Sequence, residues 1–342
     1  MQRARIAING FGRIGRLFFR QAFGDGRFDV VAINDLGEPK NLAYLLKYDT
    51  VYGRYKKDIK IEGENFVVGG GKVRVLQIKD PARLPWKELK IGIVIESTGV
   101  FESYEKAKVH LKAGAKRVII TAPAKDADGT EGKTVLMGVN EGELKKVVLT
   151  SNGSCTTNAA SPVIQIMSEN PGIEKAVLNT VHGYTATQNL VDGPLRERSE
   201  DFRRGRAAAQ NIVPSTTGAA IAVTRAIPEL KGKFDGIAIR VPTVTGSIAD
   251  ITFVAKRKVT AEEINDIFRK AAKDKRWEGV LKVTEDQIVS SDVIGEPYGA
   301  IVDLSFTKVI DGNLVKVFSW YDNEAGYVAT LLKHAEKAAE LI

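Results

Sequence analysis

Asn9-Gly10-Phe11-Gly12-Arg13-Ile14-Gly15 is the stretch of this 342-residue chain that decides the fold. It is a G-x-G-x-x-G set placed between an apolar strand expected over 5–9 and a helix expected over 13–23. In this setting Gly10 permits a tight turn, Gly12 lets the backbone approach a pyrophosphate, and Gly15 lets the helix pack closely on the sheet. Glycines are also common at ordinary turns, so the motif alone is weak support for a nucleotide site.

Asp35 strengthens that interpretation, because it follows a second strand, expected over 28–34, and lies twenty residues after Gly15. An acid at this spacing accepts hydrogen bonds from an adenosine ribose. Its carboxylate also repels a 2′-phosphate, and no arginine follows it directly. The motif and the acid together predict NAD as the cofactor, in preference to NADP.

The first half of the chain alternates β-branched runs with helical patterns, which predicts a Rossmann-type doubly wound parallel sheet. Its expected elements are strands at 5–9, 28–34, 90–96, 117–121 and 147–150 and helices at 13–23 and 103–113. After residue 172 the strands lack regular intervening helices, which predicts an α+β domain with a mostly antiparallel sheet. Its expected elements are strands at 175–181, 236–241, 247–257, 301–309 and 314–320, helices at 156–168, 206–226 and 261–275, and a closing amphipathic helix over 324–342.

Composition restricts the class of protein. Hydrophobic residues make up 44% and charged residues 27%, as in ordinary globular proteins, and the length of 342 residues predicts two domains. No apolar run reaches the roughly 18 residues of a membrane span, and the N-terminus lacks a secretion signal, so we expect no membrane and a cytoplasmic location. The net charge of +8 favours anionic partners such as phosphorylated metabolites, whereas 7% aromatic residues without an RNA-binding motif make nucleic acid an unlikely primary partner.

Cys155 is the single cysteine, which excludes an intrachain disulfide framework and multi-cysteine metal sites, and we expect no metal. It begins an expected helix, and a helix N-terminus lowers a thiol pKa below its usual value of about 8.5. A lone cysteine is more often a small buried hydrophobe. The polar neighbours in 151–158 weaken that alternative and make Cys155 a candidate nucleophile.

Only three histidines can serve as an imidazole base: His110, His182 and His334. His110 lies in a lysine-rich helix and His334 in the terminal helix, and we expect both at the surface. His182 ends an apolar strand, where catalytic groups often gather, although a structural histidine is equally compatible with this position. His182 is therefore the candidate base.

Six motifs in this order closely resemble the phosphorylating glyceraldehyde-3-phosphate dehydrogenases. They are NGFGRIG at 9–15, SNGSCTTN at 151–158, HGYTATQ at 182–188, RAAAQNIVPSTTGAA at 206–220, RVPT at 240–243 and SWYDNEAGY at 319–327. The departures are small: Gly153 replaces a usual alanine, Ala159 stands where many members have a second cysteine, and Gly183 follows the histidine.

The resemblance implies that Cys155 attacks an aldehyde, that His182 assists, and that inorganic phosphate releases the resulting thioester. It implies an NAD-binding domain over 1–150 and 321–342, a catalytic domain over 151–320, and a homotetramer. The motif and the resemblance together place the cofactor on Gly10, Phe11, Gly12, Arg13, Ile14, Gly15, Asp35, Ser97, Thr98, Thr121 and Asn323.

The resemblance also implies two anion sites. The first would hold the substrate phosphate on Thr185, Thr187 and Arg240, and the second would hold inorganic phosphate on Ser154, Thr156, Thr217 and Gly218. Which arginine of the 196–206 loop faces phosphate stays open, with Arg203, Arg204 and Arg206 as candidates. Asn323 would hold the nicotinamide carboxamide, and it could also cap the terminal helix.

Three alternatives remain at this stage. Erythrose-4-phosphate dehydrogenase shares the fold and the cysteine–histidine pair, and aspartate-semialdehyde dehydrogenase fits the threonine and arginine set poorly. From another class, the charge and the dinucleotide fold allow RNA-binding or scaffolding as a secondary function.

Overall fold

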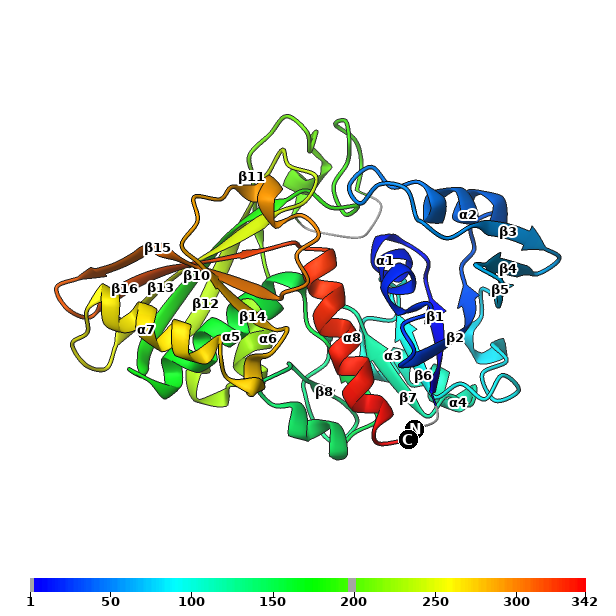
Figure 1. Ribbon diagram of the computed structural model, residues 1–342, viewed down its shortest axis with the longest axis horizontal. Coiled ribbons are helices and arrows are strands. Elements are labelled where there is room, and N and C mark those ends of the chain that lie inside the picture. Colours follow the sequence, from blue (N-terminus) through cyan, green and yellow to red (C-terminus); the bar gives the residue numbers. More distant parts are fainter. Residues whose placement is uncertain (1–2, 196–200) are drawn as a thin grey trace. The chain divides into compact units, whose positions relative to one another are not determined.

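The computed structural model describes residues 3–195 and 201–342 and divides the chain into two compact units (Figure 1). The first unit consists of Met1–Val135, Glu141–Gly153 and Leu331–Ile342, and the second of Leu136–Asn140 and Ser154–Thr330. The predicted fold class is confirmed, because one unit holds a mostly parallel sheet and the other a mostly antiparallel sheet.

The sheet of the first unit has nine strands in the order β3-β4-β5-β2-β1-β6-β7-β9-β8. The strands are β1 Ala4–Asn9, β2 Phe28–Asn34, β3 Ile59–Glu62, β4 Asn65–Val68, β5 Gly71–Leu76, β6 Ile93–Glu96, β7 Arg117–Ile120, β8 Lys133–Thr134 and β9 Leu149–Ser151. The helices are α1 Arg13–Ala22, α2 Pro39–Lys47, α3 Tyr104–Ala107 and α4 Val109–Lys112. The run from β5 to β8 is parallel, while β3, β4 and β5 form an antiparallel extension that was not expected from the sequence.

The central strands β1 and β6 are mostly apolar because both faces of the sheet are covered there. Ile6, Ile8 and Ile93 are fully buried, as expected for interior parallel strands. Apart from Arg5 near the start of β1, their polar side chains lie where the strands end, at Asn9 and Glu96. The carboxyl edge of a parallel sheet is where ligands bind, so this edge is the candidate cofactor site.

The sheet of the second unit has seven strands in the order β11-β12-β10-β13-β16-β15-β14. The strands are β10 Ile173–Gly183, β11 Val213–Thr216, β12 Phe234–Val241, β13 Ser247–Ala255, β14 Leu281–Thr284, β15 Ala300–Ile310 and β16 Leu314–Tyr321. The helices are α5 Cys155–Glu169, α6 Ala219–Ala226 and α7 Ala261–Ala271, and α8 Ala325–Ala339 continues from this unit into the first.

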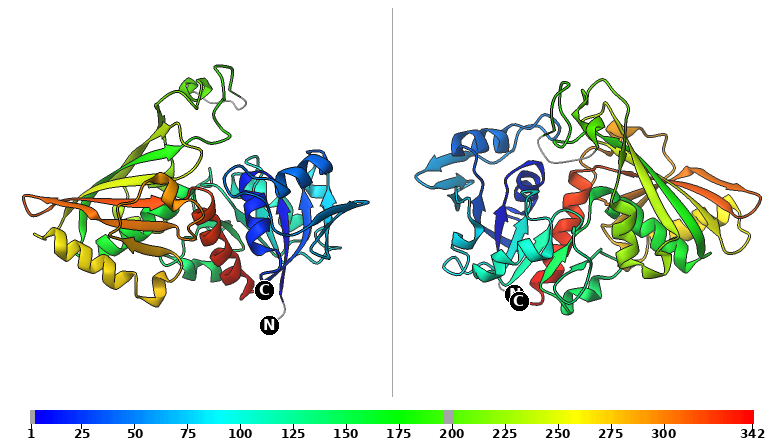
Figure 2. Two further views of the ribbon diagram at one scale, coloured as in Figure 1. Left: turned by 45° about the horizontal axis from the view of Figure 1, so that its top comes forward. Right: turned by 180° about the vertical axis from the view of Figure 1, so that it is seen from behind.

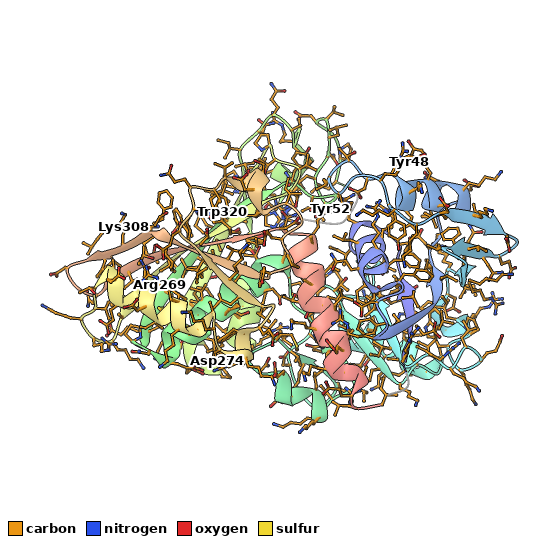
Figure 3. All side chains as sticks on the ribbon, in the orientation of Figure 1. Tyr48, Tyr52, Arg269, Asp274, Lys308 and Trp320 are labelled. Carbon is orange, nitrogen blue, oxygen red and sulfur yellow. The ribbon has the colours of Figure 1, made fainter. Side chains whose placement is uncertain are left out.

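Helices cover one face of the second sheet (Figure 2). Leu178, Ile251 and Val317 are buried on that face, whereas Val177 and Ile237 on the opposite face are about half exposed, at 53% and 54%. Figure 3 shows the outer side of α7, where Arg269 pairs with nearby carboxylates. Among the helices of the described residues, none combines the length and the apolar character needed to cross a membrane.

Two expected helices differ from the structure. The helix expected over 206–226 is wrong in its first part, because Val213 and Thr216 belong to β11, which pairs with β12, and α6 begins only at Ala219. β-Branched residues favour a strand where a partner strand is present. The helix expected over 103–113 divides at Lys108 into α3 and α4.

The expectation that His110 and His334 lie at the surface is also wrong, since both are fully buried. His334 of α8 contacts two polar groups near β9: its Nε2 lies 2.9 Å from Thr150 Oγ1, and its Nδ1 lies 3.0 Å from Asn152 Oδ1. Burial, assisted by the charge of Arg117, lowers the pKa of His334 to about 3. The imidazole is therefore neutral in the folded protein, and it joins the terminal helix to the strand before Cys155.

A buried neutral histidine makes stability depend on pH. Unfolding returns the His334 pKa to about 6.5, so the unfolded chain binds a proton that the folded chain excludes. This group therefore lowers the free energy of unfolding as pH falls from about 6.5 toward 3, by up to about 1.4 kcal/mol per pH unit. The amide in His334→Gln does not titrate. We therefore expect the free energy of unfolding, measured with urea, to fall less in this variant than in the wild type between pH 7 and about 4.5. An identical pH dependence in both proteins would contradict this role.

Candidate active site

The glycine-rich turn has the geometry that a dinucleotide requires. Gly10 has φ +93°, and a Cβ there would lie 2.6 Å from the backbone of Ser97 and Thr98. A Cβ on Gly15 would lie 2.1 Å from the carbonyl oxygen of Gly10, whereas a Cβ on Gly12 would meet no atom within 4 Å. The N-cap residue of α1 is Gly12, which has no side chain to cap the helix. Open space beside uncapped N–H groups suits an anion such as a pyrophosphate.

The structure brings Asp35 to this turn. Asp35 Oδ2 accepts a hydrogen bond from Phe11 N at 2.7 Å, and Oδ1 accepts one from Gly37 N at 2.8 Å. The carboxylate is thereby fixed at the end of β2, and each oxygen keeps capacity for a hydroxyl donor. The ring of Phe11 is buried in the core, so Phe11 contributes through its backbone. Arg13 pairs with Asp49, which directs its guanidinium to that carboxylate.

The other predicted cofactor residues lie at the ends of strands or at the start of α1. Ser97 Oγ donates to Gly10 O at 2.7 Å, Thr98 N donates to Glu96 Oε1 at 2.9 Å, and Thr121 Oγ1 donates to Glu96 O at 3.0 Å. Ile14 lies half-buried in the first turn of α1. Gly10, Ser97 and Thr98 therefore meet at the carboxyl edge, next to the end of β7.

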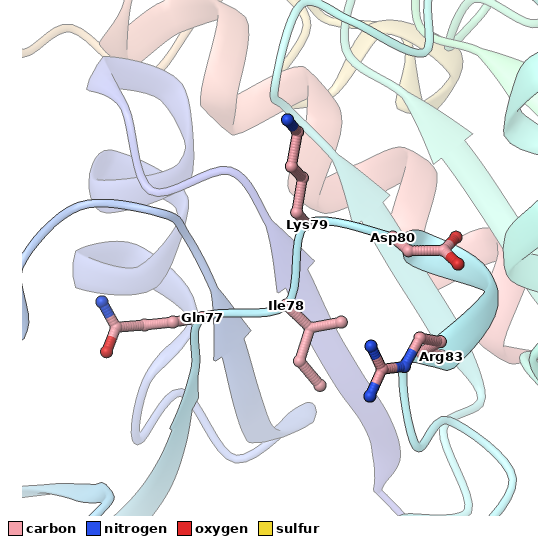
Figure 4. Close-up of a pocket in the computed structure, with 5 residues that line it drawn as sticks. All are labelled: Gln77, Ile78, Lys79, Asp80 and Arg83. Atoms are coloured by element: carbon pink, nitrogen blue, oxygen red, sulfur yellow. The ribbon is translucent and has the colours of Figure 1, made fainter.

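A cavity of about 550 Å³ lies in the segment after β5 (Figure 4). Its lining residues are Gln77, Ile78, Lys79, Asp80 and Arg83. Gln77 Nε2 donates to Gly37 O at 3.1 Å, so this segment contacts the loop that follows Asp35. This cavity was not expected from the sequence. The signal that could have indicated it is the presence of two basic residues, Lys79 and Arg83, in the segment that follows β5.

In the second unit, Cys155 and His182 are in contact. Ser154 caps α5 through a capping box with Thr157, which places Cys155 in the first turn of the helix. His182 lies near the end of β10, and its Nε2 lies 3.3 Å from Cys155 Sγ. Its Nδ1 lies 2.6 Å from Gly183 O, and a carbonyl oxygen can only accept, so Nδ1 carries the proton. The lone pair of Nε2 is therefore directed at the thiol.

The expected lowering of the Cys155 pKa is not found. Burial raises the pKa of Cys155 to about 11, although the N–H of Thr156 and the charge of Arg240 oppose this rise. Burial also lowers the pKa of His182 to about 4. Each of these two pKa shifts reflects the free-energy cost of forming one charge at a desolvated position. Proton transfer from Sγ to Nε2 forms two opposite charges at the N-terminus of α5, and their attraction offsets part of that cost.

Arg240 lies beside this pair, because the register of β10 and β12 makes it the neighbour of His182. Its Nη1 donates to Thr185 Oγ1 at 3.1 Å and to Gln188 Oε1 at 3.2 Å, and Thr185 Oγ1 lies 2.8 Å from Thr187 Oγ1. Burial, followed by the charge of Arg204, lowers the pKa of Arg240 to about 10. Within the described part of the chain no carboxylate lies in ion-pair contact with Arg240. We call Arg240, Thr185, Thr187 and Gln188 the Arg240 cluster; its charge and hydroxyl groups suit an anion.

The second predicted anion set is arranged around two helix N-termini. Gly218 is the N-cap residue of α6, which packs against α5. Thr217 Oγ1 accepts from Ala219 N, the first N–H of α6, and Ser154 Oγ accepts from Thr157 N. Thr156 Oγ1 lies 2.9 Å from the buried hydroxyl of Tyr321, so this threonine is directed toward the core.

The loop arginines differ in position. Arg204 donates to Thr216 O at 3.2 Å, and its charge lowers the pKa values of His182 and Arg240. Arg203 pairs with Asp201 and Arg206 with Asp192, and Arg204 Nε also lies 4.0 Å from Asp201 Oδ2. Residues 196–200 of the loop lie outside the described residues. Arg204 is therefore the described loop arginine that acts on this site, and sequence reasoning did not single it out.

Asn323 is buried, and its Oδ1 accepts from Thr245 Oγ1 at 3.1 Å, Gly246 N at 3.1 Å and Ser247 Oγ at 2.9 Å. The expectation that it caps the terminal helix is wrong. Asp322 Oδ1 accepts from the N–H groups of Glu324 and Ala325 at 2.8 and 2.9 Å and so takes that role. The oxygen of Asn323 is committed to these donors, which leaves its Nδ2 as the group that could bind a ligand.

Together, the glycine-rich turn with its acid on a parallel sheet, and the second unit with its cysteine–histidine contact, define the class of NAD-dependent oxidoreductases. The family model for glyceraldehyde 3-phosphate dehydrogenase, NAD binding domain, matches residues 4–104, and the one for the C-terminal domain matches residues 154–323. The chain belongs to the glyceraldehyde-3-phosphate dehydrogenase family. The predicted family resemblance and the predicted cofactor NAD are thereby confirmed.

Similar proteins cover nearly the whole chain. A glyceraldehyde-3-phosphate dehydrogenase of Clostridium pasteurianum is 46% identical over 341 residues, which cover 98% of this chain and 99% of that protein. One of Streptomyces coelicolor is 47% identical over 326 residues, which cover 94% and 95%. One of Mycobacterium avium is 48% identical over 331 residues, which also cover 94% and 95%.

The geometry of Asp35 predicts cofactor selectivity. Asp35→Gly removes the ribose acceptor and the charge that repels a 2′-phosphate. We expect the dissociation constant for NAD to rise about tenfold, and the ratio between the dissociation constants for NADP and NAD to become smaller. Titration calorimetry with both nucleotides checks this. Wild-type protein that binds NADP more tightly than NAD would contradict the argument.

The contact between His182 and Cys155 predicts the pH dependence of thiol reactivity. His182→Asn removes the acceptor of the thiol proton but leaves the desolvation of the partly buried thiol in place, so the pKa of Cys155 should rise further. We expect iodoacetamide to alkylate Cys155 at higher pH in the variant, and dehydrogenase turnover to fall at least about 10²-fold. Alkylation rates measured across pH in both proteins test this. An unshifted profile would mean that the helix N-terminus alone activates the thiol.

Proposed function

We propose that the protein oxidises glyceraldehyde 3-phosphate with NAD and inorganic phosphate to 1,3-bisphosphoglycerate through a thioester on Cys155. The observation that carries this proposal is the contact between Cys155 and His182 beside the Arg240 cluster. A nucleophile with its base lies next to a cation that lacks an acidic partner among the described residues. This arrangement suits an aldehyde that carries a phosphate.

The chemistry follows from the proton positions. Cys155 Sγ attacks the aldehyde carbon while its proton passes to Nε2 of His182, and the imidazolium then protonates the oxygen of the adduct. When the adduct is oxidised, Nε2 takes that hydroxyl proton back, so a thioester forms on Cys155. NAD, when bound, supplies the hydride acceptor. General-base assistance of this kind contributes about 10²–10⁴ in rate.

Phosphate then attacks the thioester carbon, the acyl–sulfur bond breaks, and Cys155 leaves as a thiolate that regains its proton from His182. Arg240, Thr185 and Thr187 would bind the phosphate ester of the substrate. Ser154, Thr217 and Gly218 would bind the attacking phosphate, and Thr156, whose hydroxyl contacts Tyr321, would do so through its backbone N–H. Arg204 would join that second site, because it donates to the carbonyl oxygen of Thr216, the residue before Thr217. Guanidinium, hydroxyl and N–H groups are the usual ligands of phosphate.

The residues of the first unit fit NAD. Gly10, Phe11, Gly12, Arg13, Ile14 and Gly15 would hold the pyrophosphate through the turn and the start of α1. Asp35 would hold the adenosine ribose, and the cavity beside Gln77 would admit the adenine. Ser97, Thr98 and Thr121 would complete this site. Asn323, which belongs to the second unit, would donate through Nδ2 to the nicotinamide carboxamide.

We also propose that copies of the chain associate as a homotetramer in the cytoplasm. The sheet face opposite the helices of the second unit carries exposed apolar side chains, including Val177, Ile237 and Phe306. Exposed apolar surface of this kind is typical of protein contacts. Light scattering on the purified protein tests the number of copies.

The deciding experiment is an NAD reduction assay with glyceraldehyde 3-phosphate and inorganic phosphate. Parallel assays replace the aldehyde by erythrose 4-phosphate, replace NAD by NADP, or omit phosphate. We expect the highest kcat/KM with glyceraldehyde 3-phosphate and NAD, and dependence on added phosphate. A higher value with erythrose 4-phosphate would make that aldehyde the substrate, and activity independent of phosphate would exclude the phosphorylating reaction.

Arg240 gives a sharper test of the substrate phosphate. Loss of a charge-assisted contact costs about 1.5–3 kcal/mol, or roughly ten- to a hundredfold in binding. We expect Arg240→Leu to lower kcat/KM for glyceraldehyde 3-phosphate by this factor, and much less for unphosphorylated glyceraldehyde. Arg269→Leu, which removes a surface arginine of α7, serves as the control and should change neither value. Equal losses for both aldehydes in Arg240→Leu would show a structural role.

A further inference from the structure

A group of buried polar side chains lies behind the cofactor edge of the first unit, and nothing in the proposed mechanism uses it. We call Asn9, Asn34, Trp86, Glu96 and His110 the Glu96 cluster. All five residues are buried, and Trp86 and His110 are completely excluded from solvent. They come from the ends of β1, β2 and β6, from the segment before β6, and from α4.

The first chain of hydrogen bonds begins at Trp86. Its indole N–H can only donate, and Nε1 lies 3.1 Å from His110 Nδ1, so Nδ1 must be the unprotonated acceptor. The single proton of the neutral imidazole is then on Nε2. His110 Nε2 lies 2.9 Å from Glu96 Oε2 and donates to it. Trp86 therefore fixes the tautomer that His110 presents to Glu96.

The second chain begins at a backbone group. The N–H of Ile78 donates to Asn34 Oδ1 at 2.9 Å, which fixes Asn34 Nδ2 as the donor to Ile78 O at 3.1 Å and to Asn9 Oδ1 at 2.7 Å. Asn9 Nδ2 consequently donates to Glu96 Oε2 at 2.6 Å. The backbone of the segment that lines the cavity thus determines the orientation of both amides.

Both chains therefore deliver donors to Glu96. Oε2 accepts from Asn9 and His110, while Oε1 accepts from the N–H and the hydroxyl of Thr98. The Thr98 hydroxyl is itself fixed, because it accepts from Val100 N at 3.0 Å. Among the described residues, four donors and no acceptor surround the carboxyl group, so hydrogen bonding assigns the carboxylate form to Glu96 and the neutral form to His110.

We propose that ionised Glu96 is a positioning residue for NAD, held in place by the Trp86–His110 pair. This inference rests on the proposed cofactor role of Thr98 and of the cavity after β5. The carboxylate ties the Thr98 turn, through Asn9 and Asn34, to Ile78 in the cavity lining. An amide at position 96 offers one acceptor oxygen and one NH₂ group, so two of the four donors would face another donor. The two loops would then lose their common anchor.

The test compares Glu96→Gln with Glu102→Gln, which removes a glutamate that forms a surface ion pair with Lys125. NAD binding is measured by titration calorimetry, and iodoacetamide labelling of Cys155 reports on the second unit. We expect the dissociation constant for NAD to rise about tenfold or more in Glu96→Gln. It should be unchanged in Glu102→Gln, with equal Cys155 labelling rates in both. A dissociation constant for Glu96→Gln within about twofold of the wild-type value would overturn the proposal. A change in the Cys155 labelling rate as large as the change in the dissociation constant would also overturn it.

A measurement on the wild-type protein does not depend on the folding of a variant. The proton lies on Nδ1 in His182 and in His334, whose Nδ1 faces Asn152 Oδ1, whereas it lies on Nε2 in His110. Nitrogen-15 NMR should therefore show that one of the three imidazoles carries its proton on Nε2 and the other two on Nδ1. His110→Gln should remove the signal of the Nε2–H imidazole. A His110 imidazole protonated on Nδ1, or on both nitrogens, would overturn the proposal. Wild-type protein that fails to bind NAD would instead contradict the proposed function.

Discussion

The hydrogen bond from His182 Nδ1 to the carbonyl oxygen of Gly183 is the interaction on which the proposed chemistry depends. A backbone carbonyl cannot donate, so this contact holds the proton on Nδ1 and leaves the lone pair of Nε2 facing Cys155 Sγ. The reversed tautomer would present a donor to a thiol that must lose its own proton. The end of β10 sets this geometry, because it positions the ring and Gly183 in one short segment.

The same principle operates at the other two histidines. Each imidazole is buried, and each has a contact that assigns its proton: Trp86 for His110, Gly183 for His182 and Asn152 for His334. Buried polar groups are stable only when they are hydrogen-bonded, so such contacts restrict each ring to one protonation state. All three histidines lie close to strands that lead to the candidate sites. The fold thereby fixes hydrogen-bond directions at both sites.

The sequence was sufficient for the fold class, the family and the cofactor, because glycine spacing, the acid after β2 and strand periodicity reflect local constraints. It failed where long-range burial decides the outcome. His110 and His334 resemble surface residues in their helices, but each is enclosed by partners distant in sequence. The predicted lowering of the Cys155 pKa was wrong for the same reason. The position of Cys155 in its helix can be read from the local sequence, whereas the burial that raises its pKa comes from distant residues. The strand β11 forms only because β12 is available beside it.

The thioester on Cys155 is the central claim, and mass spectrometry of the protein tests it directly. The protein is mixed with glyceraldehyde 3-phosphate and excess NAD without inorganic phosphate, quenched in acid and digested. The account predicts a 3-phosphoglyceroyl adduct on the peptide that contains Cys155, which disappears when inorganic phosphate is added before the quench and is absent from Cys155→Ser. NAD reduction without any adduct, or an adduct on another residue, would contradict it.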